Sequence, residues 1–546
     1  MRPIFLVILL ILIASFFRFY NLEKTGPIFY DEGQYIAEAI YVKDILVWSG
    51  KFITKLPFSA EKAKFIDISV HSFQSLGEEA KTGRPIHNLV MALGTLIIPI
   101  SQNWGNYVMA SFGILNIGLT FILTLVLTKS KKTSLLAAIF LSLLPLHIFY
   151  SRLVMAEMDS QFFFLISLIL YIKRIQTNKL IYWYLTSTFI SIALITNGDR
   201  IAFLTPIVTE IIYYRLRALK SLIIFAIAFI FSIILVEIPY HIAFLLTHNY
   251  NLYIPNPTYI EQQLWIYTRL SNFGTKLNLL SLLSYPYMLI STTGYLFFTF
   301  IIIGFIKSLK LKDKLNNVIL ICLSLTLLFQ SIHSLQALRA ISAILPLLTI
   351  EAAIGILFVI KVLETKIKNK NLLTIFSLLL VSTTILELFI NSLPILNYIS
   401  PYQNLSIFLN NNQAKSLVTT NDIVIKNFIP NVKTINYQNT LGVNNFSKFE
   451  SEQPNFIITT IQKYTILTKA INLSSDLDPI TKSIEANCQP VFSVTNLNSS
   501  ILLKLFAFEH NSKLNQTHQF IEKYKNQKDQ LQVYNFKECI KKISFH

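Results

Sequence analysis

The chain has 546 residues, of which 53% are hydrophobic and only 14% are charged. Several apolar runs reach the roughly 17–25 residues that cross a bilayer, which excludes a set of soluble domains. The formal net charge of +18 does not indicate nucleic-acid binding, because the basic residues gather in short segments between the apolar runs, as membrane topology requires.

Eleven apolar runs are expected to form membrane-spanning helices, and the shortest are 160–172 and 201–214. The first run is not expected to be a cleaved signal peptide, because residues 16–20 offer no small-residue cleavage site. In chain order the runs are 4–17, 107–128, 133–150, 160–172, 180–196, 201–214, 221–247, 286–306, 315–332, 340–360 and 371–393.

The basic residues predict the orientation of these spans. Five short loops hold 17 basic residues and two acidic ones, and all five fall on one side of the membrane when eleven spans are counted. Cytoplasmic loops carry such an excess of lysine and arginine, so the N-terminus is expected in the cytoplasm and the C-terminus outside. The five clusters lie within residues 129–132, 173–179, 215–220, 307–314 and 361–370.

The first external loop, residues 21–106, contains two adjacent carboxylates, Asp31 and Glu32, at the start of a predicted amphipathic helix over 31–48. Acidic groups at the lipid boundary are costly unless something uses them. Adjacent helical residues point about 100° apart, so one carboxylate is expected to face a reaction centre while the other bonds nearby backbone. Helix capping, with Gln34 three residues after Asp31, is the alternative and is compatible with catalysis.

Arginines and acids recur in the later outer segments. Arg84 precedes Pro85 at the end of the first loop, and Arg152 is followed by Glu157 and Asp159 before the fourth predicted span. The second group is also compatible with a merely solvated turn.

Two more arginines lie on the same predicted face. Arg339 opens the tenth span, where snorkelling to the interface is the alternative role, and Arg200 is expected to form a local turn with Asp199. Arginine forks bind phosphate bidentately, and a nearby carboxylate can accept a proton from a hydroxyl. A lipid-linked phosphate and an acceptor hydroxyl would satisfy both kinds of group.

The tail, residues 394–546, changes character to shorter apolar runs with many Asn, Gln and Lys residues. It predicts a small extracytoplasmic α/β domain, with a loosely ordered region as the alternative. Cys488 and Cys539 lie there, and the compartment permits a disulfide whose formation the sequence leaves open. The predicted strands are 416–420, 456–460 and 491–495, and the predicted helices are 421–429 and 463–471.

Together these motifs resemble the GT-C superfamily of integral-membrane glycosyltransferases, near the protein O-mannosyltransferases and the lipid A aminoarabinose transferases. The family often has Asp-Glu-Ala-Arg-Tyr in its first external loop, where residues 31–35 read Asp-Glu-Gly-Gln-Tyr. It often has Lys-Pro-Pro-Leu at the end of that loop, where residues 84–86 read Arg-Pro-Ile. Ser-Arg at 151–152 with a following acid, and Arg-Ala at 339–340 with Pro346, complete the likeness.

The resemblance covers roughly residues 1–360, and it depends on the order and sidedness of the motifs. Gln34 stands where the family usually has arginine, and Ala340 where it usually has tyrosine. The resemblance implies a polytopic α-helical membrane protein with about 11 transmembrane helices, in which residues 1–393 form the catalytic domain and 394–546 the α/β domain.

The resemblance also implies an activity. A sugar would move from a polyprenyl-phosphate donor to an acceptor hydroxyl on the extracytoplasmic face, with inversion at the anomeric carbon. Asp31 and Glu32 are the expected catalytic pair, with Asp31 preferred as the base. The other expected roles are phosphate binding by Arg84, Arg152 and Arg339, and orientation of the acceptor by Tyr35, Glu157 and Asp159.

No cofactor is expected, although Glu157 or Asp159 would bind a divalent cation in a metal-using relative. Glu237 and His241 form another possible metal pair, with an intramembrane hydrogen bond as the alternative. The expected partners are a polyprenyl-phosphate-linked sugar, a protein, lipid or glycan acceptor, and membrane lipid, with no nucleic acid.

The competing function is a transporter or flippase for a lipid-linked sugar, and a structural or accessory membrane protein is the third. Transporters place ionisable groups near the membrane midplane. The inner halves of the spans are expected to lack charge here, with the ionisable groups at one face, which favours an enzyme.

Overall fold

The computed structural model describes residues 3–54, 84–198, 200–214, 218–247, 279–311, 313–332, 337–419, 422–429, 431–436, 454–460, 484, 486–494, 499–510, 522 and 531–541. The chain divides into two compact units. The helical unit comprises Met1–Tyr20, Tyr35–Ile100 and Trp104–Leu396, and the sheet unit comprises Asn21–Gln34, Ser101–Asn103 and Asn397–His546.

Every predicted apolar run falls on helix, because a chain in lipid must satisfy its backbone hydrogen bonds internally. The first half of the helical unit contains α1 (Pro3–Phe19), most of α2 (Tyr30–Thr54), α4 (Pro85–Gly94), α5 (Trp104–Thr128), α6 (Lys131–Leu143), α7 (Pro145–Ser151), α8 (Glu157–Thr177) and α9 (Leu180–Thr196). The second half contains η2 (Ile201–Leu204), α10 (Thr205–Tyr213), α11 (Ala218–Thr247), α13 (Leu279–Thr293), α14 (Tyr295–Lys310), α15 (Lys314–Ile332), η5 (Leu338–Ile344), α16 (Leu345–Lys366) and α17 (Lys370–Leu396).

The chain is an integral membrane protein. Among the described residues, five helices are long and apolar enough to cross a bilayer, or six when a bent pair is taken as one span. Leu180–Thr196 and Ile201–Tyr213 are shorter apolar helices. The total of eleven spans stays a prediction.

Two predicted spans are interrupted. The run 133–150 bends by 61° between α6 and α7, where Pro145 starts the new helix. The run 286–306 is not one helix as predicted, because it breaks at Gly294, whose φ of 106° suits glycine. The backbone N–H groups of Leu296 and Phe297 then donate to the Glu387 carboxylate, which caps the start of α14.

Glycine allows a close helix crossing between α14 and α16. A Cβ at Gly304 would collide with the backbone carbonyl of Glu351, and one at Gly355 would collide with that of Phe300. Small residues allow the backbones of membrane helices to approach and gain packing energy.

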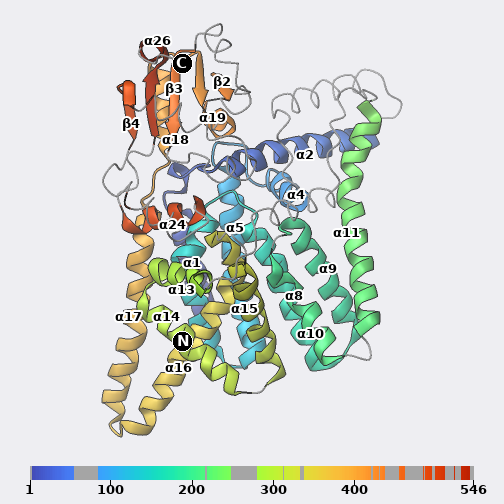
Figure 1. The fold of residues 1–546 in the computed structure, drawn as a ribbon. Coiled ribbons are helices and arrows are strands. Elements are labelled where there is room, and N and C mark those ends of the chain that lie inside the picture. Colours follow the sequence, from blue (N-terminus) through green and yellow to red (C-terminus); the bar gives the residue numbers. More distant parts are fainter. Residues whose placement is uncertain are drawn as a thin grey trace. The chain divides into compact units, whose positions relative to one another are not determined.

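The lysine-rich turns lie at one end of the helical unit, which we call the lysine end. Helices α2 and α4 lie at the opposite end, which we call the far end (Figure 1). Several contacts join helix termini at the lysine end. Among them, Gln176 Nε2 donates to the Val126 carbonyl (3.2 Å), Arg174 lies over the Tyr214 ring (4.8 Å), and Lys314 lies over the Tyr213 ring (5.6 Å).

The sheet unit contains a mixed five-stranded sheet in the order β2-β1-β3-β5-β4. Strands β1, β2 and β3 are parallel, and β5 runs antiparallel between β3 and β4. The strands are β1 (Ser416–Thr419), β2 (Lys433–Asn436), β3 (Phe456–Thr460), β4 (Phe492–Val494) and β5 (Leu531–Asn535), and the helices include α18 (Pro401–Asn411), α19 (Asp422–Phe428), α24 (Ser500–His510) and α26 (Phe536–Ile540).

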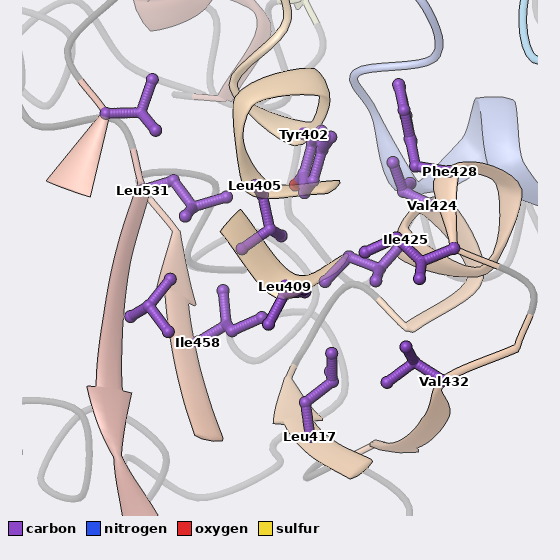
Figure 2. Packing of buried hydrophobic residues seen from close by; sticks show 13 residues of the cluster. Tyr402, Leu405, Leu409, Leu417, Val424, Ile425, Phe428, Val432, Ile458 and Leu531 are labelled. Atoms are coloured by element: carbon purple, nitrogen blue, oxygen red, sulfur yellow. The ribbon is translucent and has the colours of Figure 1, made fainter. Parts of the chain in front are cut away.

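Side chains from α18 and α19 cover the sheet and form its core with β1, β3 and β5. Leu405 and Leu409 are four residues apart on one face of α18 and meet Leu417, Ile458 and the α19 side chains there (Figure 2). The other members labelled in the figure are Tyr402, Val424, Ile425, Phe428, Val432 and Leu531.

Three strands and α19 lie where the sequence predicts them, whereas β2 and β5 are not predicted. The predicted helix at 463–471 lies outside the described residues. Cys488 and Cys539 form a disulfide, with Cα atoms 5.3 Å apart, which settles the pairing that the sequence left open. Within the helical unit, Cys322 is buried as a free thiol.

Candidate functional site

Two buried polar contacts hold residues at the start of α8 at the far end: His87 contacts Asp159, and Arg200 contacts Glu157. His87 Nδ1, from the first turn of α4, lies 2.8 Å from Asp159 Oδ2, and both side chains are fully buried. Asp159 Oδ1 accepts from the backbone N–H of Ser160, as a carboxylate in the first turn of a helix can. The predicted acceptor-orienting residue Asp159 is therefore joined to a histidine that the sequence did not single out.

Tyr35 and Arg84, which the sequence places 49 positions apart, come together beside this histidine. The Tyr35 ring meets the His87 ring edge to face at 4.8 Å, and the Arg84 guanidinium lies 5.8 Å from the Tyr35 ring centroid. Tyr35 thus contacts both an aromatic partner and a cation, each a favourable geometry.

A second contact between the same two helices reinforces this arrangement. Asn88 on α4 donates from its amide to Glu38 on α2. Glu38 follows Tyr35 by three residues on α2, and Asn88 follows His87 on α4, so the two contacts are neighbours along one helix–helix seam.

Glu157 forms an ion pair across the far end. Arg200 Nη2 donates to Glu157 Oε1 at 2.9 Å, and both side chains are 2% exposed. The predicted local turn of Arg200 with Asp199 stays a prediction, because Asp199 lies outside the described residues. The predicted acceptor-orienting residue Glu157 is held by a guanidinium from the start of η2.

Arg152, a predicted phosphate ligand, is also buried. Its Nη1 donates to the carbonyl oxygens of Tyr20 (2.8 Å) and Arg18 (3.3 Å), and Asn106 donates to the Arg152 carbonyl at 2.7 Å. Burial lowers the pKa of Arg152 to about 10, so its guanidinium keeps its charge at neutral pH. This arginine holds the end of α1 against the segment that follows α7.

A buried polar chain supports the same region, and the sequence did not predict it. Arg18 donates to the carbonyls of Ser142 and Leu141, which the break between α6 and α7 exposes, and it also contacts His147 Nδ1 at 2.8 Å. His147 Nε2 meets Gln161 Oε1 at 3.0 Å, and Gln161 Nε2 donates to the Ser342 carbonyl at 2.6 Å. This series of polar contacts therefore joins α1, α7, α8 and η5.

Arg339 lies in η5 and is half-buried. Its helix meets the start of α8 through Gln161 and Ser342. The predicted phosphate ligand Arg339 therefore belongs to the far end, as do Arg84 and Arg152.

Asp31 and Glu32 stand in the first turn of α2, among the residues that belong to the sheet unit. Glu32 is fully buried, and its Oε1 accepts from the backbone N–H groups of Ile28 (2.8 Å) and Phe29 (2.9 Å). One carboxylate of the pair does bond nearby backbone, as the geometry of adjacent helical residues predicts. Asp31 is half-buried, and its role as a base stays a prediction.

The expectation that the inner halves of the spans lack charge is wrong. Glu351 is buried on α16 and accepts from Ser308 at 2.8 Å. Arg174 and Glu210 form a buried pair at 3.4 Å near the lysine end. Buried acidic side chains are tolerated in a helix bundle when other helices supply their partners. The positions of the charged residues in the sequence do not reveal those partners.

The described residues contain no cluster of three or more His, Cys, Asp or Glu side chains that could hold a metal ion. Glu157 and Asp159, the possible cation ligands, contact Arg200 and His87 instead, which does not fit a cation site. The side chains of Glu237 and His241 lie outside those described.

Solved structures share this architecture. The oligosaccharyltransferase of Archaeoglobus fulgidus, in complex with Zn and sulfate, is similar with a TM-score of 0.53 and 11% identity, over 97% of this chain and 88% of that one. ArnT from Cupriavidus metallidurans is similar over 85% of this chain and 94% of its own, at 12% identity, with TM-scores of 0.56 when bound to undecaprenyl phosphate and 0.55 in the apo state. No family model and no curated protein matches the chain.

The likeness identifies the class of fold: this chain has the fold of the GT-C superfamily of integral-membrane glycosyltransferases. The resemblance that the sequence motifs indicated is confirmed at the level of the fold. Identities of 11% and 12% carry no more than this, because unrelated activities can share one fold.

Proposed function

We propose that this protein is a glycosyltransferase that moves a sugar from a polyprenyl-phosphate donor to an acceptor hydroxyl, with inversion at the anomeric carbon. The observation that carries the proposal is a GT-C fold whose far end gathers buried arginines and acids, opposite the lysine end. Glycosyl transfer from a phosphate needs a cationic site for the leaving group and one base for the acceptor.

The far end is proposed to face the outside of the cell. Lysine-rich turns favour the cytoplasm, which assigns the lysine end and the N-terminus to that side. The disulfide between Cys488 and Cys539 supports an extracytoplasmic domain over residues 394–546, because disulfides persist in oxidising compartments.

Asp31 is the proposed base. Glu32 is occupied by two backbone N–H groups, so Asp31 is the member of the pair that we assign to the acceptor hydroxyl. The acceptor oxygen forms the new bond to the anomeric carbon, its proton passes to Asp31, and the electrons of the broken C–O bond stay on the lipid phosphate. Arg84, Arg152 and Arg339 are proposed to offset that negative charge.

Tyr35, Glu157 and Asp159 are proposed to orient the acceptor side of the site. Each is held by a neighbour at the far end: Tyr35 by His87, Glu157 by Arg200, and Asp159 by His87. Preorganisation of this kind supports transfer, because misplaced groups lose much of their effect on the transition state.

The test is transfer of radiolabelled sugar from polyprenyl-phosphate donors in membranes that contain the full chain. Asp31→Asn should lower transfer by roughly 10²–10⁴-fold, the usual contribution of a general base. Glu23→Gln makes the same chemical change at an exposed position and should leave transfer unchanged. Equal activity of Asp31→Asn and wild type would remove Asp31 from the base role, and movement of the lipid across the bilayer without transfer would replace the proposal with a flippase.

A further inference from the structure

His87 has a free hydrogen-bonding position at the far end that the proposed chemistry does not use. Its side chain is fully buried, and its Nδ1 contacts Asp159 at 2.8 Å. Within the residues that the structure describes, its Nε2 has no hydrogen-bond partner. A buried polar atom without a partner is costly, so this nitrogen points to a ligand.

The surroundings of His87 favour an anion. Helix α4 begins at Pro85 after Arg84, and no side chain caps its start. The N–H groups of Ile86 and His87, in the first turn, have no acceptor within the helix. A helix N-terminus with free N–H groups is a favourable place for a phosphate.

The contact of His87 with Asp159 determines which imidazole nitrogen is available to a ligand. Asp159 accepts from Nδ1–H, which leaves Nε2 at the opposite edge of the ring. When the imidazole is protonated, Nε2–H is a charged donor. Tyr35 packs against the ring and also contacts Arg84, so the imidazole and the guanidinium belong to one cluster.

We propose that His87, positioned by Asp159, is a further ligand of the donor phosphate, with Nε2–H donating to a phosphate oxygen of the polyprenyl-phosphate headgroup. This inference rests on the proposed function and adds a residue to its donor site. When the C–O bond of the donor breaks, its electron pair stays on the phosphate oxygen. The hydrogen bond from His87 strengthens as this negative charge develops.

The test measures binding of a short-chain polyprenyl phosphate to the purified full chain. His87→Ala should raise its Kd by about 10–100-fold, the value of a charge-assisted hydrogen bond. His87→Gln keeps a neutral donor near the Nε2 position and should bind with an intermediate Kd. Leu93→Ala, on the exposed side of the same helix, is the matched control and should bind as the wild type does.

Asp159→Asn tests the positioning role. It should raise the Kd for polyprenyl phosphate in the chain that has His87 but not in the His87→Ala chain, because the carboxylate acts on the phosphate through the imidazole. A purely structural role would instead lower the thermal unfolding temperature and raise the Kd in both chains. Wild-type binding of polyprenyl phosphate by both His87→Ala and His87→Gln would overturn the proposal.

Two further arms separate this inference from the proposed function. Inorganic phosphate should compete weakly; competition as strong as that of the lipid phosphate would assign the site to free phosphate and overturn the lipid assignment. Binding that depends on His87 in a chain without sugar transfer would support the phosphate site and reject the glycosyltransferase. Transfer that depends on Asp31 but not on His87 would do the reverse.

Discussion

Arg152 and Tyr20 are joined by a hydrogen bond of 2.8 Å from the guanidinium to the backbone carbonyl. Tyr20 follows α1 directly, and Arg152 follows α7, so this bond holds two chain segments that are 132 positions apart. The same guanidinium is a proposed phosphate ligand. A guanidinium with five N–H donors can do both, because different N–H groups point in different directions.

Replacing Arg152 should therefore affect both stability and transfer. Arg152→Ala removes a donor from the backbone carbonyls of Arg18 and Tyr20, and the buried Arg18 carbonyl left unsatisfied costs about 1–3 kcal/mol. Arg152→Lys keeps a charge but loses the fork, so it should retain partial stability and reduced transfer. Thermal unfolding in detergent, measured beside donor KM, checks the two effects. An Arg152→Ala protein with unchanged unfolding would contradict the structural half.

The Glu157–Arg200 pair should behave as a buried ion pair in a double-mutant cycle. Glu157→Gln or Arg200→Gln alone removes one charge of the buried pair and should destabilise the fold by about 3–5 kcal/mol. The double variant should cost less than the sum, because neither charge remains. Additive losses in urea unfolding would show that the two side chains do not interact.

Gly304→Ala should destabilise the α14–α16 crossing. The added methyl group would meet the carbonyl of Glu351, and overpacking of this kind typically costs about 1–3 kcal/mol. Gly118→Ala, on α5 with no atom near the added carbon, is the matched control and should hold or slightly raise stability, since alanine favours helix. Equal unfolding temperatures for the two variants would show that α14 and α16 are not in close contact.

Labelling should show that Cys488 and Cys539 are oxidised in the mature protein. A thiol reagent applied to unfolded protein should modify one cysteine per chain, Cys322, before reduction and three afterwards. Loss of the disulfide should destabilise the sheet unit by about 2–4 kcal/mol, because it closes a loop of 51 residues. Three reactive thiols without reductant would place this segment in a reducing compartment and count against the proposed orientation.

Helices were predictable from the sequence because crossing a bilayer demands a long apolar run. Their interruptions were not, since the cause lies elsewhere in the chain. The break at Gly294 depends on Glu387, more than 90 positions away, as the cap of α14. Strand β5 was missed for a similar reason: it gains its place from pairing with β4 and with β3, which is 79 positions earlier at the Phe456–Asn535 pair.

For the site, the outer-face arginines and acids were predictable from sidedness and from resemblance, but their partners were not. His87 lies three residues after Arg84, but its partner Asp159 is 72 positions away. The sequence did not predict that Arg200 also pairs with Glu157, 43 positions earlier. Long-range pairs of this kind follow from helix packing, which composition and spacing do not encode.

Lysine and arginine are distributed differently between the two ends of the helical unit. Lysine dominates the turns at the lysine end, whereas Arg84, Arg152, Arg200 and Arg339 belong to the far end. Orientation in a membrane needs net charge alone, which either residue supplies, but directed contacts need the planar fork. Conservative exchange should consequently have different effects at the two ends: the lysine turns can accept arginine, whereas Arg152 and Arg200 lose directed hydrogen bonds when lysine replaces them.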